Sequence, residues 1–220
     1  MPWVACLILS VALAATRGSA LAQPLVEPAQ LPLAYASGIS FPVIDPALEL
    51  KSQHLVDALR AGGLVLFMRH AHTSDPKPVC PDEGGLTQTG EQQARWVGAA
   101  IKRLRVPIAA VQASALCRAK DTAVLLGLGE ITVNAELNPG AIRDVAYDQA
   151  RRFAYLNRQP PPNTNVLLVS HVQGTPVKSD NILIELAEVV VYRPVNGGRP
   201  LPVARIPVSS WQALLSLAPP

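Results

Sequence analysis

The feature that most constrains the fold is an apolar run, Leu64 to Met68, that ends directly in Arg69 and His70. Five consecutive apolar residues after two glycines are typical of a strand buried on both faces, as in a parallel sheet covered by helices. Ligands bind at the carboxyl ends of strands in such sheets, so a cation beside an imidazole there indicates a site for an anion. A single Arg-His pair is a weak motif, more often an ordinary surface pair.

Two further segments bring polar side chains to the same predicted edge. The run from Asn165 to His171 is again apolar and ends in a histidine. Ile108 to Ala113 predicts another buried strand, followed by a helix with Ser114 as its expected N-cap and Arg118 near its first turn. Two arginines, two histidines and a helix N-terminus at one sheet edge would form a positive pocket able to hold a phosphoryl group.

In these segments the chain resembles the histidine phosphatase superfamily, also called phosphoglycerate mutase-like. R-H-A-H-T from Arg69 is similar to the family's R-H-G-x-T or S, and S-A-L-C-R-A-K-D-T-A from Ser114 to its S-x-x-x-R-A-x-x-T-A. V-S-H, ending at His171, resembles the second histidine motif. L-T-Q-T-G-E-Q-Q-A over 86–94 looks like the family's L-T-x-x-G-x-x-Q-A helix start. The joint match is far more specific than any one piece.

The resemblance covers roughly Ala58 to Tyr192. It is closest to a group of exported bacterial members that includes the lipopolysaccharide core heptose phosphate phosphatases, which also accept alanine where the signature has glycine, as at Ala71. It implies an α/β fold of three layers, α/β/α, with a mostly parallel central sheet.

The resemblance also implies the chemistry. His70 would attack phosphorus and form a phosphohistidine that water later hydrolyses. Arg69, Arg118 and His171 would neutralise the charge on the phosphoryl oxygens, and Thr73 would add a hydroxyl donor. No metal and no cofactor is expected.

The general acid departs from the family pattern, because Pro139 occupies the position where many members carry glutamate. Glu136, Glu83, Asp75 and Asp144 are the carboxylates that could substitute. A second departure is Gly174, where members of the exported group often carry asparagine.

The N-terminus predicts export. An apolar stretch over 3–15, too short to span a bilayer, is followed by Ala20-Leu21-Ala22, an A-x-A cleavage site before Gln23. We therefore expect a signal peptide over 1–22, an extended lead-in over 23–45 and one phosphatase-like domain over 46–220. An uncleaved anchor is the alternative, because no Lys or Arg precedes the apolar stretch.

Cleavage would remove Cys6 and leave Cys80 and Cys117. An even pair of cysteines in an exported protein favours a disulfide between them. Two free buried thiols are the alternative, and the wide spacing is unlike that of a zinc site.

Charge and aromatic content limit the partners. A net charge of +3 is too small to argue for nucleic acid or a membrane surface. The few aromatic residues are not clustered, which counts against stacking platforms for bases. A phosphorylated small molecule or an envelope sugar phosphate is the expected partner, and the sequence does not indicate an oligomeric state.

Local patterns predict the remaining elements. Thr89 and Glu91-Gln92 resemble a capping box that starts a helix. The predicted helices are Pro46 to Arg60, the one from Thr89, Ala115 to Leu126 and Ile142 to Asn157; further strands are Ile131 to Val133, Glu188 to Tyr192 and Val203 to Ile206; and Thr73 to Leu86 is expected to be a loop.

The predicted function is phosphomonoester hydrolysis through phosphohistidine, in the periplasm or outside the cell. A phosphate-binding or regulatory domain with weak turnover is the alternative. A phosphomutase is less favoured, because mutases keep the glutamate that Pro139 replaces.

Overall fold

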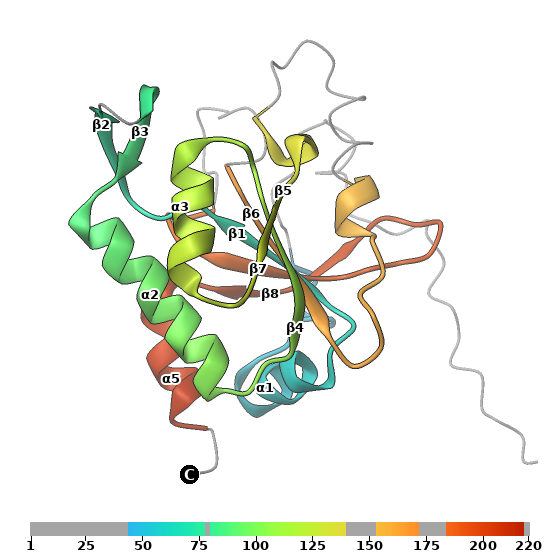
Figure 1. Cartoon of the computed structure of the whole chain (residues 1–220). Coiled ribbons are helices and arrows are strands. Elements are labelled where there is room, and N and C mark those ends of the chain that lie inside the picture. The colour runs from blue at the N-terminus through green and yellow to red at the C-terminus, as the bar shows by residue number, and fades with distance from the viewer. Residues whose placement is uncertain (1–43, 78–79, 140–152, 172–183, 218–220) are drawn as a thin grey trace, which may run out of the picture. The chain divides into compact units, whose positions relative to one another are not determined.

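The computed structural model describes residues 44–77, 80–139, 153–171 and 184–217, with side chains omitted for 75–83. Its centre is a six-stranded sheet with the strand order β5-β4-β6-β1-β7-β8 (Figure 1). The strands are β1 Val65–Arg69, β4 Ile108–Ala113, β5 Ile131–Val133, β6 Asn165–Ser170, β7 Val189–Arg193 and β8 Leu201–Ile206. The predicted signal peptide (1–22) and nearly all of the lead-in (23–45) lie outside the described residues.

The sheet is mostly parallel, as the sequence predicts. β5, β4, β6 and β1 run parallel to one another, whereas β7 and β8 continue the sheet beyond β1 in antiparallel pairs. The register places Val65 opposite Val166 and Arg69 opposite Ser170. Because parallel strands end at the same edge, the residues that follow β4, β6 and β1 meet there.

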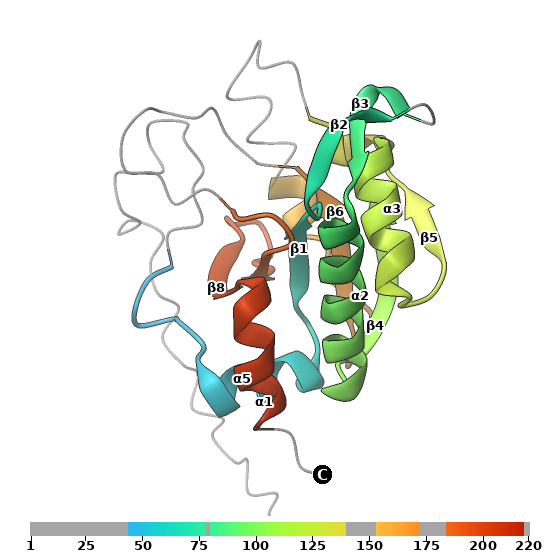
Figure 2. The same cartoon turned by 90° about the vertical axis from the view of Figure 1, so that its left-hand side faces the viewer.

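Four helices cover one face of the sheet (Figure 2). They are α1 Ser52–Ala61, α2 Gln88–Arg103, α3 Cys117–Leu126 and α5 Trp211–Leu215, the last preceded by the 3-10 turn η4 Val208–Ser210. Their apolar side chains share one core with Leu66 and Met68 of β1. Trp211 lies fully buried in this core.

A second core lies on the opposite face. Val65 and Phe67 of β1 pack there with Leu137 of the 3-10 helix η3 (Ala135–Leu137) and with Tyr155, from a helical segment at 153–156. The rings of Phe67 and Tyr155 stack with their centroids 6.4 Å apart. β1 is therefore buried on both faces, which confirms the prediction from its apolar run.

The helix starts differ from the sequence predictions. Thr87, rather than Thr89, is the N-cap of α2, and its Oγ1 accepts a hydrogen bond from the N–H of Gly90 at 3.1 Å. The predicted capping box is therefore wrong. α3 begins at Cys117 instead of Ala115, and the hydroxyl of Ser114 serves the site described below.

The first predicted helix also begins later than expected. A turn over 46–48, closed by the bond from the N–H of Leu48 to the carbonyl of Asp45, occupies its predicted start. The side chain of Asp45 accepts the N–H of Ala47 at 2.9 Å, and this local bond competes with the helix.

The segment from Thr73 to Leu86, predicted as a loop, is a β-hairpin of β2 (Thr73–Lys77) and β3 (Cys80–Leu86). Its pairing is irregular, with register shifts on both sides of Pro76. Prolines and acidic residues are uncommon in strands, so the segment lacks the apolar pattern that predicts one. Within the described ranges, no helix is both long and apolar enough to cross a membrane.

Candidate active site

Three adjacent parallel strands deliver the predicted site residues to one edge of the sheet. β1 ends in Arg69 and is followed by His70, β6 is followed by His171, and β4 by Ser114. Since the strand order is β4-β6-β1, these ends are neighbours (Figure 1). The imidazole rings of His70 and His171 lie with their centroids 5.2 Å apart, at an angle of 57°.

The backbone of His70 is held on one side by β6 and on the other by the turn that precedes β7. Its N–H donates to the carbonyl of Ser170 at 2.9 Å, and its carbonyl accepts the N–H of Ala187 at 3.1 Å. The side chain is nearly buried, with an exposed fraction of 6%.

One hydrogen bond assigns the tautomer of His70. Its Nδ1 lies 2.9 Å from the carbonyl oxygen of Ala71. A carbonyl can only accept, so Nδ1 must carry the proton in the neutral ring. The lone pair is then on Nε2, the nitrogen that would attack phosphorus.

His171 carries the opposite tautomer. Nε of Arg118 donates to its Nδ1 at 3.3 Å, which places the proton on Nε2. Nε2 donates to the hydroxyl of Ser114 at 2.8 Å, and this hydroxyl donates to Oδ1 of Asn138 at 2.9 Å. Oδ1 also accepts the N–H of Ala115. This chain of bonds orients the ring of His171 and, through it, Arg118.

Both histidines are neutral at physiological pH. Burial is the main cause that lowers the pKa of His70 to about 4 and that of His171 to about 3. The positive charges of Arg118 and Arg69 lower both pKa values further. Two neutral rings beside two cations leave a net positive site suited to an anion.

The arginines are arranged to receive that anion. Burial, followed by the charge of Arg118, lowers the pKa of Arg69. Nη1 of Arg69 donates to the carbonyl of Ile184 at 2.8 Å, whereas its buried Nε has no hydrogen-bond partner among the described residues. An unpaired buried donor is costly, and an anionic oxygen would satisfy it by accepting the hydrogen bond.

Thr122, inside the second motif, joins α3 to the loop after His70. Its Oγ1 accepts the N–H of Ala71 at 3.0 Å and donates to the carbonyl of Arg118 at 2.7 Å. The two motifs therefore hold one another in place.

Gly90 explains the L-T-x-x-G pattern. A Cβ built on it would lie 2.1 Å from the carbonyl oxygen of His72, too close for any side chain. The start of α2 thus packs directly on the loop that follows His70. His72 itself is exposed, with its Nδ1 2.9 Å from Oγ1 of Thr87.

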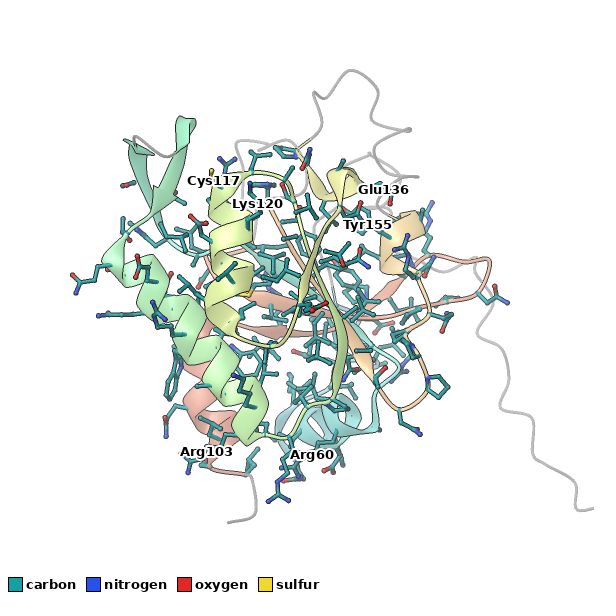
Figure 3. The ribbon with its side chains drawn as sticks, in the orientation of Figure 1. Arg60, Arg103, Cys117, Lys120, Glu136 and Tyr155 are labelled. Carbon is teal, nitrogen blue, oxygen red and sulfur yellow. The ribbon has the colours of Figure 1, made fainter. Side chains whose placement is uncertain are left out.

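Of the remaining predicted residues, the structure describes the side chains of only Thr73, Glu136 and Cys117. Thr73 opens β2 and is half-buried. Glu136 is exposed on η3, and Figure 3 shows it at the same end of the sheet as Cys117, away from Arg60 and Arg103. The side chains of Glu83, Asp75 and Cys80, and all of Asp144 and Gly174, lie outside the described residues. The acid and the Cys80–Cys117 bond stay predictions.

Asn138 belongs to the site but was not predicted from the sequence. It stands in A-E-L-N-P, the segment in which Pro139 replaces the expected glutamate, one residue before Pro139. Its contact with Ser114 spans 24 positions, and no local pattern predicts it.

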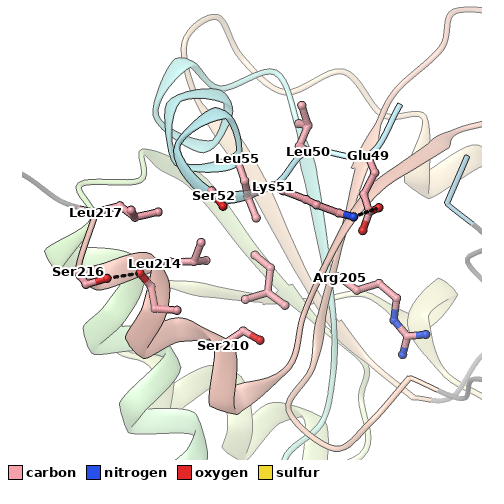
Figure 4. Close-up of a pocket in the computed structure, with 12 residues that line it drawn as sticks. Glu49, Leu50, Lys51, Ser52, Leu55, Arg205, Ser210, Leu214, Ser216 and Leu217 are labelled. Atoms are coloured by element: carbon pink, nitrogen blue, oxygen red, sulfur yellow. Dashed lines mark hydrogen bonds and ion pairs between the residues drawn. The ribbon is translucent and has the colours of Figure 1, made fainter. Parts of the chain in front are cut away.

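The described part of the chain contains no group of three or more His, Cys, Asp and Glu side chains that could hold a metal ion. A cavity of about 490 Å³ lies elsewhere, between the start of α1, the end of β8 and α5 (Figure 4). Its lining includes Lys51, Leu55, Arg205 and Leu214, and none of the predicted site residues.

Comparisons with known proteins agree with the fold of this chain. Residues 65–144 match the family model of the histidine phosphatase superfamily (branch 1). The structure of the protein histidine phosphatase SixA complexed with tungstate superposes with a TM-score of 0.51 at 20% identity, over 67% of this chain and 98% of that one. A Nakamurella multipartitia protein described as a phosphohistidine phosphatase SixA gives a TM-score of 0.51 at 16% identity, over 66% and 95%. At these identities the structures show the shared fold. No curated protein matches the sequence significantly.

The lowered pKa values predict acid sensitivity of the fold. Between pH 6.5 and about 4 for His70, and about 3 for His171, the unfolded chain binds protons that the folded chain does not. The stability that these groups contribute is complete above pH 6.5 and is lost as the pH falls through that window. The thermal midpoint of His70→Asn should therefore fall less between pH 7.5 and pH 4.5 than that of the parent. NMR titration tests the cause directly, and a folded-state pKa near 6.5 for His70 would contradict it.

Proposed function

We propose that this chain, whose residues 65–144 match the histidine phosphatase superfamily, is a phosphomonoester hydrolase that works through a phosphohistidine on His70. The observation that carries the proposal is the tautomer of His70. Its Nδ1–H is bound to the Ala71 carbonyl, so a neutral ring presents Nε2 beside Arg69 and Arg118. A phosphate-binding domain would need the cations but not a nucleophile kept neutral and oriented.

The reaction would proceed in two displacements. Nε2 of His70 attacks phosphorus, the bond to the ester oxygen breaks, and the alcohol leaves after taking a proton. Water then attacks the phosphohistidine, the P–N bond breaks, and orthophosphate leaves while the proton of water is released to solvent. Arg69 and Arg118 counter the charge on the equatorial oxygens in both steps, so the residues supply positioning and electrostatics without a metal.

Arg118 is well prepared for this role. Its Nε is bound to His171, which fixes the plane of the guanidinium group. None of the described residues accepts a hydrogen bond from its two terminal nitrogens, and these would bind two phosphoryl oxygens as a fork. His171 would contribute by holding Arg118, because its Nδ1 accepts from Nε of Arg118 while its Nε2 donates to Ser114.

The general acid, which would protonate the leaving alcohol, and the substrate complete the proposal. Pro139 replaces the expected glutamate, and Glu136 is the nearest described carboxylate in sequence. We place Glu136 or Glu83 as the acid, and expect the substrate to be a phosphorylated small molecule or an envelope sugar phosphate.

The first test is the nucleophile. His70→Ala should abolish hydrolysis across a panel of phosphomonoesters assayed without added metal, because both ring nitrogens of the neighbouring His171 are engaged by Arg118 and Ser114. Labelled substrate quenched in alkali should reveal an acid-labile phosphoenzyme in the parent and none in the variant. His54→Ala, at an exposed position on α1, is the control and should retain parent activity. Hydrolysis by His70→Ala near the parent rate would refute the assignment.

The second test concerns the planar fork of Arg118. Arg118→Lys keeps the charge but loses the bidentate geometry and the Nε bond to His171, so kcat/KM should fall by roughly ten- to a thousandfold with little change in thermal midpoint. Arg95→Lys on the exposed side of α2 is the matched control. Unchanged kinetics for Arg118→Lys would remove this residue from the site.

Export and the disulfide form the finer part of the proposal, and they rest on the signal-like N-terminus and the two remaining cysteines. A bond between Cys80 and Cys117 would join β3 to the first residue of α3, beside Arg118. The bond would close a loop of 37 residues. The chain-entropy model gives such a bond at most about 4 kcal/mol of stabilisation.

This bond predicts a redox effect on activity. Reduction should lower activity at temperatures where the domain is still folded, because it frees the hairpin before the sheet unfolds. Mass spectrometry of unreduced peptides is the direct measurement. Two alkylatable thiols in protein purified from the periplasm would contradict the bond.

A further inference from the structure

The turn from Ile184 to Glu188, which leads into β7, contains a fully buried carboxylate. Glu188 has an exposed fraction of 0% and forms a bidentate ion pair with Arg205 of β8. The Arg205 side chain is 19% exposed. Oε2 of Glu188 also accepts the N–H of Glu185 at 2.6 Å. The carboxylate thus satisfies donors from both the turn and the neighbouring strand.

The backbone of this turn contacts the catalytic segment at three points. The N–H of Ala187 donates to the carbonyl of His70 at 3.1 Å, and the N–H of Arg69 donates to the carbonyl of Glu188 at 3.1 Å. The carbonyl of Ile184 accepts from the guanidinium of Arg69 at 2.8 Å. The position of the turn therefore sets both the main chain of His70 and the side chain of Arg69.

The turn also holds a backbone conformation that requires support. Ala187 has φ +60°, in the left-handed region that residues with a Cβ seldom adopt. It is completely buried. The bonds that close the turn are those between Glu185 and Glu188: one from the N–H of Glu188 to the carbonyl of Glu185 at 3.2 Å, and the carboxylate bond described above. Strain of this kind persists where the surroundings over-determine it, and it is common next to active sites.

We infer that Glu188, braced by Arg205, is a positioning residue that holds the 184–188 turn and thereby places His70 and Arg69 for reaction with a phosphoryl group. Glu188 does not touch the substrate in this role. The activity part of the inference rests on the proposed function; the structural part does not. Because a displacement of about 1 Å at a reacting group can cost on the order of a hundredfold in rate, a loosened turn should act mainly on kcat.

The test is Glu188→Gln, which keeps the size of the side chain and removes the charge. We expect kcat to fall about ten- to a hundredfold with KM changed less than about threefold. NMR hydrogen exchange at the amides of Ala187 and Arg69 should become at least about tenfold faster relative to the α2 amide of Ile101, because the bonds to His70 and Glu188 open more often. Arg205→Lys keeps the charge but loses the planar fork. It should show a smaller fall in kcat and a smaller increase in the exchange rates of the same amides.

Two controls separate positioning from general stability. Glu185→Gln alters an exposed side chain in the same turn and should leave kcat unchanged. Leu214→Ala removes core volume in α5 and lowers the thermal midpoint without touching the turn, so its kcat below that midpoint should equal that of the parent. If Glu188→Gln does not fold, Arg205→Lys carries the test.

The outcomes separate this inference from the proposed function. If the parent hydrolyses no phosphomonoester, the proposed function fails, and the exchange measurements still decide whether Glu188 holds the turn. Parent-like exchange at Ala187 in Glu188→Gln overturns the inference, whatever the rate. Faster exchange with parent-like kcat in an active enzyme overturns it too, since the turn would then be irrelevant to the reaction.

Discussion

Arg69 and Arg118 place two guanidinium charges beside the rings of His70 and His171, and the rest of the site is arranged around that positive field. Burial, reinforced by this field, lowers the pKa of both rings and keeps them neutral. A neutral ring has a usable lone pair, and the bond to Ala71 decides which nitrogen carries it. The same repulsion between cations makes the empty site electrostatically unfavourable, so a bound dianion gains affinity from relieving it.

The sequence was sufficient to predict the parts of the site that lie at strand ends. Apolar runs before His70 and His171 indicated buried parallel strands, and parallel strands bring their carboxyl ends together whatever their order. The motif spacing also predicted that Arg118 and His171 share one site, but not the hydrogen bond between them. Thr122 is the threonine of the S-x-x-x-R-A-x-x-T-A pattern, and its bonds to Ala71 and Arg118 explain why a threonine stands there. Periodicity also located most helices and strands, because burial on one face or two leaves a readable pattern.

What the sequence did not predict depends on contacts between distant segments. Asn138 orients Ser114, but nothing near it in the chain marks it as a site residue. The left-handed conformation of Ala187 comes from bonds made by its neighbours, and an alanine gives no hint of it. The β2–β3 hairpin was missed because Pro76 and the acidic residues around it have low strand propensity. In each case tertiary structure overrides the local preference.

The pairing of β1 with β6 has a consequence for the order of folding. Leu64 and Asn165, which are joined by a hydrogen bond at the other end of this strand pair, are 101 positions apart. Closing so long a segment is slow, and β6 has to insert between β4 on one side and β1 on the other. During synthesis, a chain that has left the ribosome only as far as α3 contains His70 and both arginines, but neither His171 nor β6, the strand that joins β1 to β4. Recognition of an anion is therefore a late event, acquired only when the last third of the chain has been made.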